Sequence, residues 1–506
     1  MQLTKNVKNW DGNKMLNSIV HHDEITLWWD KEWERKDVPV YQIICNGKKL
    51  GETKKTHYTI LGLLPDTEYV IAVSNIGEIC VKTGKEKRKI DVTKAPYFAC
   101  PDGKTFNTSS LQKALDDCRQ DECVYLPQGV YLTGALNMHS DTEMYLEQGA
   151  ILQGSTNPDD YLPKIKSRFE GIETQCYRGL INIGELAHEK NPTTKNVIIR
   201  GGGSVFGGGK ELCDVTIERE RERLKDFLLA QAEYVKTCEN DRTIPGRARG
   251  RLINISNCEN VILSNVTFAY GPAWNIHFVY SKNIITHGCN IVSQGVWNGD
   301  GWNPDSSEDC TIFNTVFKTH DDGIAIKSGK NPEGNIINRP TKNIRIFDCR
   351  GRNGISLGSE MSGGVDGVYV WDCDFGTSYS GFGVKITKKR GGYVRNIKVK
   401  DCIFASIKTR CVLFNDDGES AKTPPVVENF SFENIELTCI CTNINSGTAK
   451  VSPISAIFLV GIDEPAYYLR NFTFKNIKIQ KHVQGEPQKI ELQNCENITM
   501  ENISYV

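Results

Sequence analysis

Three aspartates between residues 297 and 329 have the residue type and the spacing of an acid–base site. Asp300 lies in "WNGDGWN", and Asp321 and Asp322 form a pair in "THDDGIAIKSG". The pair follows Asp300 by about 20 residues, which is near the shortest repeat length of solenoid proteins. Strands on adjacent coils of such a protein lie roughly 4.8 Å apart. We therefore expect the three carboxyl groups to lie close together.

Clustered carboxyl groups do not all ionise easily near neutral pH, because mutual repulsion raises at least one pKa. A proton donor then stands beside carboxylates that activate water, as inverting glycoside hydrolysis requires. Two other interpretations stay open on spacing alone. Aspartates in turns accept backbone hydrogen bonds, and three neighbouring acids can bind calcium.

Asp321 and Asp322 are adjacent in the chain, so in a regular strand their side chains would point to opposite faces. Both can face outward only if the chain bends at this point. Gly323 in "HDDG" supplies a residue at which a bend can occur.

A short phrase recurs along the chain from residue 195 onward. Each copy has a polar turn, a short strand of alternating apolar residues and a second turn with Asn, Asp or Cys. Examples are "KNVIIRGGG", "CENVILSNVTF", "SKNIITHGCNI", "TKNIRIFDCR", "LRNFTFKNIKI" and "CENITMENISYV". Short strands separated by turns predict an all-β chain folded as a parallel β-helix, whose inward apolar positions stack into one core. Most turn asparagines and cysteines are then expected to be structural.

The composition favours a soluble protein that meets charged partners only locally. A formal charge of −1 over 506 residues gives no overall attraction to nucleic acid or to anionic membranes. The start "MQLTKNVKNWDGNKM" lacks an apolar signal segment, and no apolar run is long enough to cross a membrane, so we expect a cytoplasmic protein. The 18 cysteines are then expected to be reduced. The sequence has no paired C-x-x-C motifs of the kind that would indicate a zinc site. We expect neither a metal nor a cofactor.

Two domains are predicted. Residues 1–85 contain short alternating strands with turn signals, which is typical of a small β-sandwich. Within them, "YTILGLLPDTEYVIAV" resembles the later strands of a fibronectin type III domain, with Tyr69 at the position of that family's buried tyrosine. Residues 86–90 are predicted to be a charged linker, and residues 91–506 the β-helix domain.

Two segments of the second domain have helical patterns. A charged insertion at about residues 210–242 places Leu224, Phe227, Leu228 and Tyr234 at helical spacing, which predicts one or two helices. The segment "SLQKALDDC" predicts a short helix that covers the open end of the solenoid.

The motifs around the aspartates resemble those of the polygalacturonase family of pectin-degrading glycoside hydrolases. That family carries N-x-D-G, D-D, G-H-G and R-I-K motifs, and "NGDG" and "HDDG" match the first two with the family's spacing. The resemblance runs from about residue 91 to the C-terminus and implies a right-handed parallel β-helix. It also implies that Asp321 is the general acid and that Asp300 and Asp322 hold and activate the water.

Two positions depart from the family's pattern. Asn353 stands where the family has the histidine of G-H-G, and Gly383 stands where it has the arginine of R-I-K, so that only Lys385 is retained. In the family these cationic residues face the sugar on the leaving-group side. Losing an arginine weakens bidentate carboxylate recognition, and a lysine does not restore it. We therefore expect a leaving group other than galacturonate, for example rhamnose within rhamnogalacturonan.

The phrases "GSEMSGGV" and "KKRGG" resemble the exo-acting branch of the family, which often bears an N-terminal fibronectin-like module. The hypothesis is an inverting exo-type hydrolase that releases galacturonate, or a related sugar, from the non-reducing end of pectin-derived oligosaccharides. The residues expected to bind substrate are Asn298, Asn353, Lys385, Lys388, Arg390, Trp302 and His277. Packing is the alternative role for Trp302 and His277, and a solvated turn is the alternative for Lys388 and Arg390.

Three rival functions stay open at this point. The first is hydrolysis of another glycoside, such as a rhamnoside. The second is a calcium-dependent pectate lyase, because that chemistry also occurs on parallel β-helices, and sensitivity to chelators would favour it. The third is a non-catalytic sugar-binding relative, which the replaced histidine and arginine make plausible. In each case the expected partner is an oligosaccharide, with no nucleic acid and no membrane.

Overall fold

The computed structural model describes residues 16–35, 37–188, 191–377, 381–411, 418–443, 450–481 and 488–506. The chain forms two compact units. Met1–Lys89 and Arg119–Cys123 make up one unit, and Ile90–Cys118 and Val124–Val506 make up the other.

The first unit contains two antiparallel sheets, with strand orders β1-β2-β5 and β4-β3-β6-β7. The strands are β1 (Leu16–Val20), β2 (Glu24–Trp29), β3 (Tyr41–Cys45), β4 (Lys48–Thr53), β5 (His57–Leu61), β6 (Glu68–Val73) and β7 (Gly77–Lys82). Alternate residues point inward, and Ile25, Leu27 and Trp29 are buried in one cluster with Tyr41 and Ile43. The two-residue period of the sequence therefore builds a small sandwich core.

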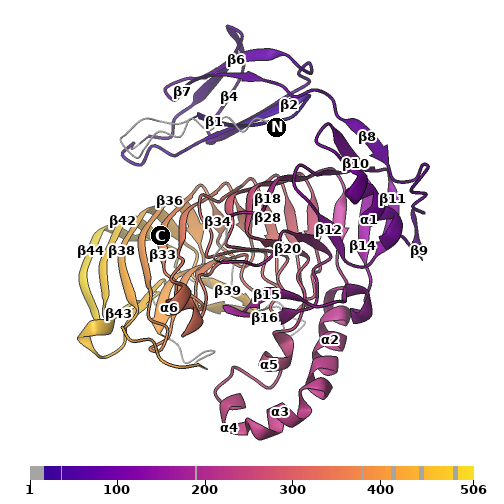
Figure 1. The fold of residues 1–506 in the computed structure, drawn as a ribbon. Coiled ribbons are helices and arrows are strands. Elements are labelled where there is room, and N and C mark those ends of the chain that lie inside the picture. The colour runs from indigo at the N-terminus through magenta and orange to yellow at the C-terminus, as the bar shows by residue number, and fades with distance from the viewer. Residues whose placement is uncertain are drawn as a thin grey trace. The chain divides into compact units, whose positions relative to one another are not determined.

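The second unit is a parallel β-helix, as predicted (Figure 1). Its wall contains a 22-stranded sheet and an 11-stranded sheet. The larger sheet comprises β8 (Arg88–Asp91), β9 (Asp102–Phe106), β10 (Glu122–Leu126), β11 (Gly129–Thr133), β13 (Glu143–Leu146), β14 (Ala150–Gly154), β18 (Thr194–Gly201), β19 (Ser204–Phe206), β21 (Cys258–Ser264), β22 (Thr267–Ala269), β24 (Lys282–His287), β25 (Asn290–Val292), β27 (Thr311–Phe313), β28 (Val316–Lys318), β30 (Thr341–Phe347), β31 (Arg350–Gly351), β33 (Val365–Trp371), β34 (Asp374–Phe375), β36 (Tyr393–Phe404), β38 (Val426–Leu437), β42 (Leu469–Ile479) and β44 (Cys495–Tyr505).

The 11-stranded sheet has one strand per coil, and its strands pair in parallel in chain order. They are β12 (Leu136–Met138), β17 (Ile181–Ile183), β20 (Ile253–Ser256), β23 (Ile276–Val279), β26 (Trp302–Asp305), β29 (Ile324–Ile326), β32 (Ile355–Leu357), β35 (Phe382–Ile386), β37 (Ile407–Cys411), β41 (Ile457–Val460) and β43 (Ile490–Gln493). Two antiparallel hairpins accompany the helix: β15 (Ile165–Phe169) with β16 (Ile172–Cys176), and β39 (Ile440–Asn443) with β40 (Lys450–Pro453).

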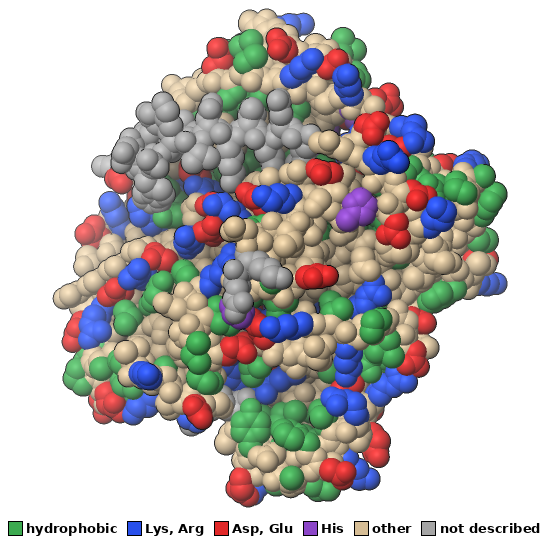
Figure 2. Space-filling view, viewed as in Figure 1, with side chains coloured by type: hydrophobic (Ala, Val, Ile, Leu, Met, Phe, Trp, Pro, Cys, Tyr) green, Lys and Arg blue, Asp and Glu red, His purple; other side chains and the backbone are tan. Residues whose placement is uncertain are grey.

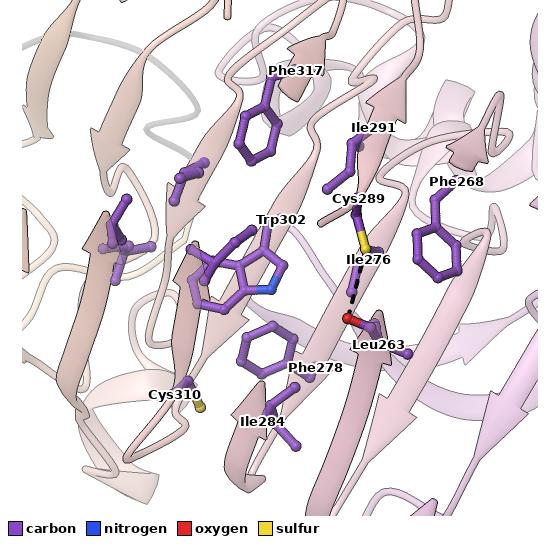
Figure 3. Packing of buried hydrophobic residues seen from close by; sticks show 14 of the residues in the cluster. Leu263, Phe268, Ile276, Phe278, Ile284, Cys289, Ile291, Trp302, Cys310 and Phe317 are labelled. Atoms are coloured by element: carbon purple, nitrogen blue, oxygen red, sulfur yellow. Dashed lines mark hydrogen bonds between the residues drawn. The ribbon is translucent and has the colours of Figure 1, made fainter. Parts of the chain in front are cut away.

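Parallel pairing places equivalent residues of successive coils above one another. Ile276 lies opposite Ile253 on one side and opposite Trp302 on the other, and all three belong to the buried core. Figure 3 shows Ile276, Phe278 and Trp302 in the same interior as Leu263 from the larger sheet. The recurring apolar phrase of the sequence therefore becomes a continuous core along the helix axis.

Asparagines in left-handed turns connect the coils. Asn196, Asn260 and Asn283 have φ values of 59°, 60° and 55°. The Asn260 amide donates to Asn196 Oδ1 at 3.1 Å, and the Asn283 amide donates to Asn260 Oδ1 at 2.6 Å. Further along, the Asn476 amide donates to Asn434 Oδ1 at 2.8 Å. Asparagine tolerates the left-handed conformation better than most residues and here satisfies its neighbour's amide, so these turn asparagines are structural.

Helices are few. The first, α1 (Thr108–Asp117), buries Leu111, Ala114 and Leu115 against the β-helix core, where the sequence predicted a covering helix. The helical insertion, residues 209–246, consists of α2 (Gly209–Arg223), α3 (Lys225–Ala230), α4 (Ala232–Val235) and α5 (Thr243–Gly246). The remaining short helices are η1 (Pro158–Tyr161), α6 (Glu333–Ile337) and η2 (Pro465–Tyr467). Within the described ranges, every helix is too short or too polar to cross a membrane.

The helical insertion differs from its sequence pattern. It contains more helices than the one or two expected, and α3 and α4 bury none of their residues. Phe227 is 47% exposed and Leu229 is 72% exposed. Hydrophobic side chains are visible at the surface over this insertion (Figure 2). Of the residues at helical spacing, Phe227 is exposed and Leu224, Leu228 and Tyr234 are half-buried, so none of them is fully buried.

Replacing Phe432 by alanine is expected to lower the free energy of unfolding of the β-helix by about 3–5 kcal/mol. Phe432 is fully buried, with its ring 5.1 Å from that of Phe474 and 5.4 Å from that of Phe382, so the substitution leaves a cavity between coils. Guanidinium unfolding followed by circular dichroism measures the loss. The control Phe106→Ala, at a position 47% exposed, is expected to cost less than about 1 kcal/mol. Equal losses would contradict the role given to Phe432.

Candidate active site

The three aspartates lie just before two neighbouring strands of the 11-stranded sheet. Asp300 precedes β26, and Asp321 and Asp322 precede β29. These strands pair in parallel with Trp302 opposite Ile324, and the Gly301 N–H donates to the Asp322 carbonyl at 3.0 Å. The segment between the aspartates therefore makes one coil and returns the chain to the same edge of the sheet.

The chain bends immediately before β29, as the sequence predicted. Within the bend, Asp321 Oδ1 accepts the N–H of Asp322 at 2.9 Å. A Cβ on Gly323 would lie 2.3 Å from the carbonyl oxygen of Asn353, so only glycine fits at this close approach of two coils. The bend gives the two adjacent carboxyl groups a common compartment.

Two lysines are interleaved with the carboxyl groups. Lys327 Nζ lies 3.4 Å from Asp300 Oδ2, and Lys385 Nζ lies 2.9 Å from Asp322 Oδ2. Ser356 donates its hydroxyl to the other oxygen of Asp322 at 2.7 Å. Asp321 has no lysine or arginine partner among the described residues. Asp300 and Asp322 therefore each have a lysine partner, while Asp321 is left without a paired cation.

Burial and mutual repulsion shift the ionisation of this cluster. Burial, opposed by Lys327 and reinforced by Asp321 and Asp322, raises the pKa of Asp300 above its ordinary value. Burial and the charge of Asp322, opposed by Lys385, raise the pKa of Asp321. Burial alone would lower the pKa of Lys327 and of Lys385. The nearby acidic groups outweigh this effect and raise both pKa values, so both lysines stay charged. The cluster therefore retains a proton at a pH at which isolated aspartates have lost theirs.

A fourth acid balances Lys327 from the next coil. Glu360 Oε2 lies 3.3 Å from Lys327 Nζ, and both side chains are buried. Burial favours the neutral acid, but Lys327 and Arg390 outweigh it and lower the pKa of Glu360 to about 2. Arg390 is fully buried and donates to the carbonyl of Ser359 at 2.8 Å. The expected sugar contact of Arg390 is therefore wrong, because this side chain supports the site from within the protein.

Asn353 and Asn298 hold the aspartate-bearing segments in place. The Asn353 amide donates to the carbonyls of Asp321 at 2.7 Å and of Thr319 at 2.9 Å. Asn298 Oδ1 accepts from Arg249 at 2.6 Å. Both asparagines thus have structural contacts that fix the cluster, in addition to the substrate contacts expected of them.

Three other expected contacts lie elsewhere. Trp302 is fully buried in the core, where its indole N–H donates to Thr286 at 3.0 Å, so the sugar contact expected of it is wrong. His277 is also fully buried, with Nε2 3.5 Å from Asp305, and cannot reach a substrate. Lys388 pairs with Glu464 at the surface. The ring of Tyr379 could also stack on a sugar, but this residue lies outside the described residues.

The hairpin β15–β16 lies across the outer face of the same sheet, and the sequence analysis did not foresee it. Ser167 donates to Asn254 at 3.0 Å, Arg168 pairs with Asp305 at 2.8 Å, and the Gly171 carbonyl accepts the N–H of Lys330 at 2.9 Å. The stretch "KIKSRFEGIETQC" carries a signal that would have revealed it, namely two short strands around Glu-Gly.

This hairpin covers the coils that precede the aspartates. The ring of its residue Phe169 stacks on Trp274 at 4.7 Å, and the outward side chains of Asn254 on β20, His277 on β23 and Asn303 on β26 are buried. The outer face of the sheet is therefore closed on the N-terminal side of the aspartates.

Comparison with known proteins agrees with this geometry. The family model of glycosyl hydrolases family 28 matches residues 195–505. The chain belongs to glycosyl hydrolase family 28. Among its relatives, the exo-poly-alpha-D-galacturonosidase of Dickeya chrysanthemi is 24% identical, over 95% of this chain and 88% of the relative.

Solved structures show the same fold. A family 28 exopolygalacturonase of Yersinia enterocolitica has a TM-score of 0.74 at 21% identity, over 97% of this chain and 96% of its own. An exopolygalacturonase of Thermotoga maritima has a TM-score of 0.65 at 25% identity, over 82% of this chain and 92% of its own. The protein is thus a glycoside hydrolase with the parallel β-helix of its family.

In this hydrolase the helical insertion is fastened to the aspartate-bearing loop. Arg242 pairs with Asp214 of α2 at 2.6 Å, and its guanidinium lies 5.1 Å from the ring centre of Trp297. The guanidinium of Arg249 also lies over the Trp297 ring, 4.5 Å from its centre, and donates to the Trp297 carbonyl at 2.8 Å. Movement of the insertion would therefore reach the segment that carries Asp300.

Glu239 is a further acid that the sequence analysis did not single out. Glu239 is exposed, but desolvation by the surrounding protein and the negative charges of Glu170 and Asp321, opposed by Lys385, raise its pKa to about 7. The insertion thus places an additional titrating carboxyl group in the electrostatic field of the aspartate cluster.

The alkaline limb of the pH profile of kcat/KM is expected to shift in opposite directions in Lys385→Met and Glu239→Gln. Lys385 lowers the pKa of Asp321, so its removal raises that pKa, and the alkaline limb of kcat/KM moves to higher pH. Ionised Glu239 disfavours ionisation of Asp321, so its neutral replacement moves the limb to lower pH.

The measurement is kcat/KM on one oligosaccharide between about pH 4 and 9. Lys195→Met removes a surface lysine that pairs with Glu259, and it is expected to leave the profile unchanged. Shifts of the same sign in Lys385→Met and Glu239→Gln would contradict the electrostatic account.

Proposed function

We propose that this hydrolase removes galacturonate, one residue at a time and with inversion, from the non-reducing end of pectin-derived oligosaccharides. The observation that carries the exo assignment is the hairpin β15–β16, which closes the outer face of the sheet beside the aspartates. A closed face accepts a chain end, whereas an open groove accepts the middle of a polymer. The exo-acting relatives support the same assignment.

Asp321 is proposed as the general acid. It lacks a paired cation, and its pKa is raised, so it keeps its proton as the pH rises towards neutrality. It gives that proton to the glycosidic oxygen as the bond from this oxygen to the anomeric carbon breaks. The leaving sugar then departs with a free hydroxyl group.

Asp300 and Asp322 are proposed to hold the water. Asp300 is paired with Lys327, and Asp322 is paired with Lys385. One of these two carboxylates takes a proton from the water as the water oxygen bonds to the anomeric carbon from the opposite face. The released sugar therefore has the inverted configuration. The two lysines also supply positive charge inside the cluster, which favours this chemistry over the calcium-site alternative.

The leaving-group side faces the coils that follow the aspartates, where Gly383 and Lys385 lie on β35. The atom nearest to a Cβ on Gly383 would lie 3.7 Å away, which is an ordinary van der Waals contact, so the position accepts a Cβ that this protein lacks. A galacturonate in the leaving-group position would have a carboxylate with no arginine partner. A neutral sugar has no carboxylate, so it binds there without that cost. We therefore propose rhamnogalacturonan fragments, in which rhamnose follows galacturonate, as the preferred substrates.

The N-terminal unit is proposed to be a fibronectin type III-like module. The hydroxyl of Tyr69 accepts the N–H of Leu64 at 2.9 Å, which is the contact expected of a tyrosine corner in such sandwiches. Tyr69 is half-buried rather than buried.

Chelator-resistant release of galacturonate monomer is expected from rhamnogalacturonan oligosaccharides, and Asp321→Asn is expected to lower kcat by at least about 1,000-fold because the proton donor is lost. Chromatography of the products measures the release, and proton NMR during the first turnovers reports the anomer. Unsaturated products or loss of activity with EDTA would favour the lyase. Binding without release in the unmodified enzyme would favour a non-catalytic relative.

Gly383→Arg is expected to raise kcat/KM on oligogalacturonides relative to rhamnogalacturonan oligosaccharides by about 10-fold, since one charge-assisted contact is worth about 1.5–3 kcal/mol. The new guanidinium restores a partner for a carboxylate on the leaving-group side. Gly383→Gln is the matched control, because it adds comparable length without charge. A ratio unchanged in Gly383→Arg would contradict the assignment of this position to the leaving group.

A further inference from the structure

A second pocket lies on the outer face of the 11-stranded sheet, over the coils that precede the catalytic ones. Its volume is about 940 Å³, within the range of small-molecule sites. Asn137 on β12, Asn182 on β17 and Asn254 on β20 form its floor and lie in one register row. These residues all belong to the β-helix, so the pocket is a feature of the same unit as the aspartates.

The hairpin β15–β16 separates this pocket from the aspartate cluster. Ile165 and Lys166 of the hairpin line the pocket, and the neighbouring residue Ser167 bonds to Asn254 of the floor. The register row continues through His277 and Asn303, which are fully buried. From β20 to β29 the sheet advances by three strands, or roughly 14 Å. One ligand chain therefore cannot lie along the sheet and occupy both compartments.

Arg178 gives this pocket an unused positive charge. The side chain is half-buried, and burial lowers its pKa. No acceptor for its guanidinium occurs within the described part of the chain. Lys166, by contrast, is already paired with Glu173 at 2.8 Å. The guanidinium of Arg178 is not among the buried polar groups that lack a partner, so solvent reaches it. A carboxylate entering the pocket can replace that water through two parallel, charge-assisted hydrogen bonds.

The rest of the lining suits a sugar. Thr193 and Thr194 offer hydroxyl groups, Asn137 carries an exposed amide, and Ile165 and Leu186 offer apolar surface for the carbon face of a ring. Glu185 contributes one exposed carboxylate to the wall. The mixture of amides, hydroxyls and small apolar patches around one cation differs from an apolar cofactor site.

We propose that this pocket is a second carbohydrate site that binds a uronate-containing oligosaccharide, with Arg178 receiving the uronate carboxylate. The site retains acidic chains at the enzyme while the catalytic compartment shortens their ends. The choice of a uronate rests on the proposed function, whereas the separation of the two compartments does not.

The test is the stoichiometry of trigalacturonate binding to full-length Asp321→Asn enzyme, measured by isothermal titration calorimetry. Two sites are expected. Asn137→Trp, which fills the pocket from an exposed position, and Arg178→Gln, which removes the cation, are each expected to leave one site. Lys385→Met is expected to weaken the other site, and the neutral trisaccharide maltotriose is expected to leave the second site empty. Circular dichroism melting verifies that each variant is folded.

The outcomes separate the two proposals. A single site that Asn137→Trp abolishes and Lys385→Met leaves intact would support the second site while removing galacturonate from the catalytic assignment. A single site insensitive to Asn137→Trp, or two sites that persist in both Asn137→Trp and Arg178→Gln, would overturn the second site. Equal binding of maltotriose would overturn its assignment to uronates.

Discussion

Parallel hydrogen bonding between successive coils is the constraint on which the rest of this structure depends. Each coil returns the chain to the same position about 4.8 Å further along the axis, so a residue's neighbours are fixed by its place in the repeat. Asn260 and Asn283 bond to their equivalents on the preceding coils, and Gly323 permits the contact with the carbonyl of Asn353. The same register brings Asp300 beside Asp322. Catalytic geometry here is a consequence of stacking, because the wall that forms the core also positions the carboxyl groups.

Charge balance then decides what those carboxyl groups can do. Three aspartates and Glu360 share two lysines: Lys327 lies between Asp300 and Glu360, and Lys385 pairs with Asp322. Leaving one charged partner alone in such a buried network is costly, and the surrounding carboxyl groups keep both lysines ionised. Burial raises the pKa of both Asp300 and Asp321, and of the three aspartates only Asp321 lacks a lysine partner among the described residues. One buried cluster thereby holds aspartates with different charged neighbours, although the aspartates themselves are chemically identical.

Additions to the β-helix shape access to this cluster without altering it. The hairpin β15–β16 closes one side of the sheet and divides its outer face into two compartments. The helical insertion contacts the loop of Asp300 through Arg242, and Arg249, just after the insertion, lies over the same Trp297 ring. Such segments project from the coils, so they can change the accepted substrate while the stacked core and its register stay the same.

The sequence by itself determined the β-helix and the aspartate cluster, because both follow from local patterns. Alternating apolar residues and turn asparagines recur with each coil, and the interval from Asp300 to Asp321 is one coil long. Only the tertiary structure decided the roles of Trp302, His277 and Arg390, which are fully buried. The identity of an aromatic or charged residue does not show whether its side chain faces the core or a cleft. Tertiary structure alone also revealed Glu239, the pairing of Lys327 with Glu360, and the wall made by the hairpin. These contacts join segments that are distant in the chain, and no local period records where an insertion folds back onto the sheet.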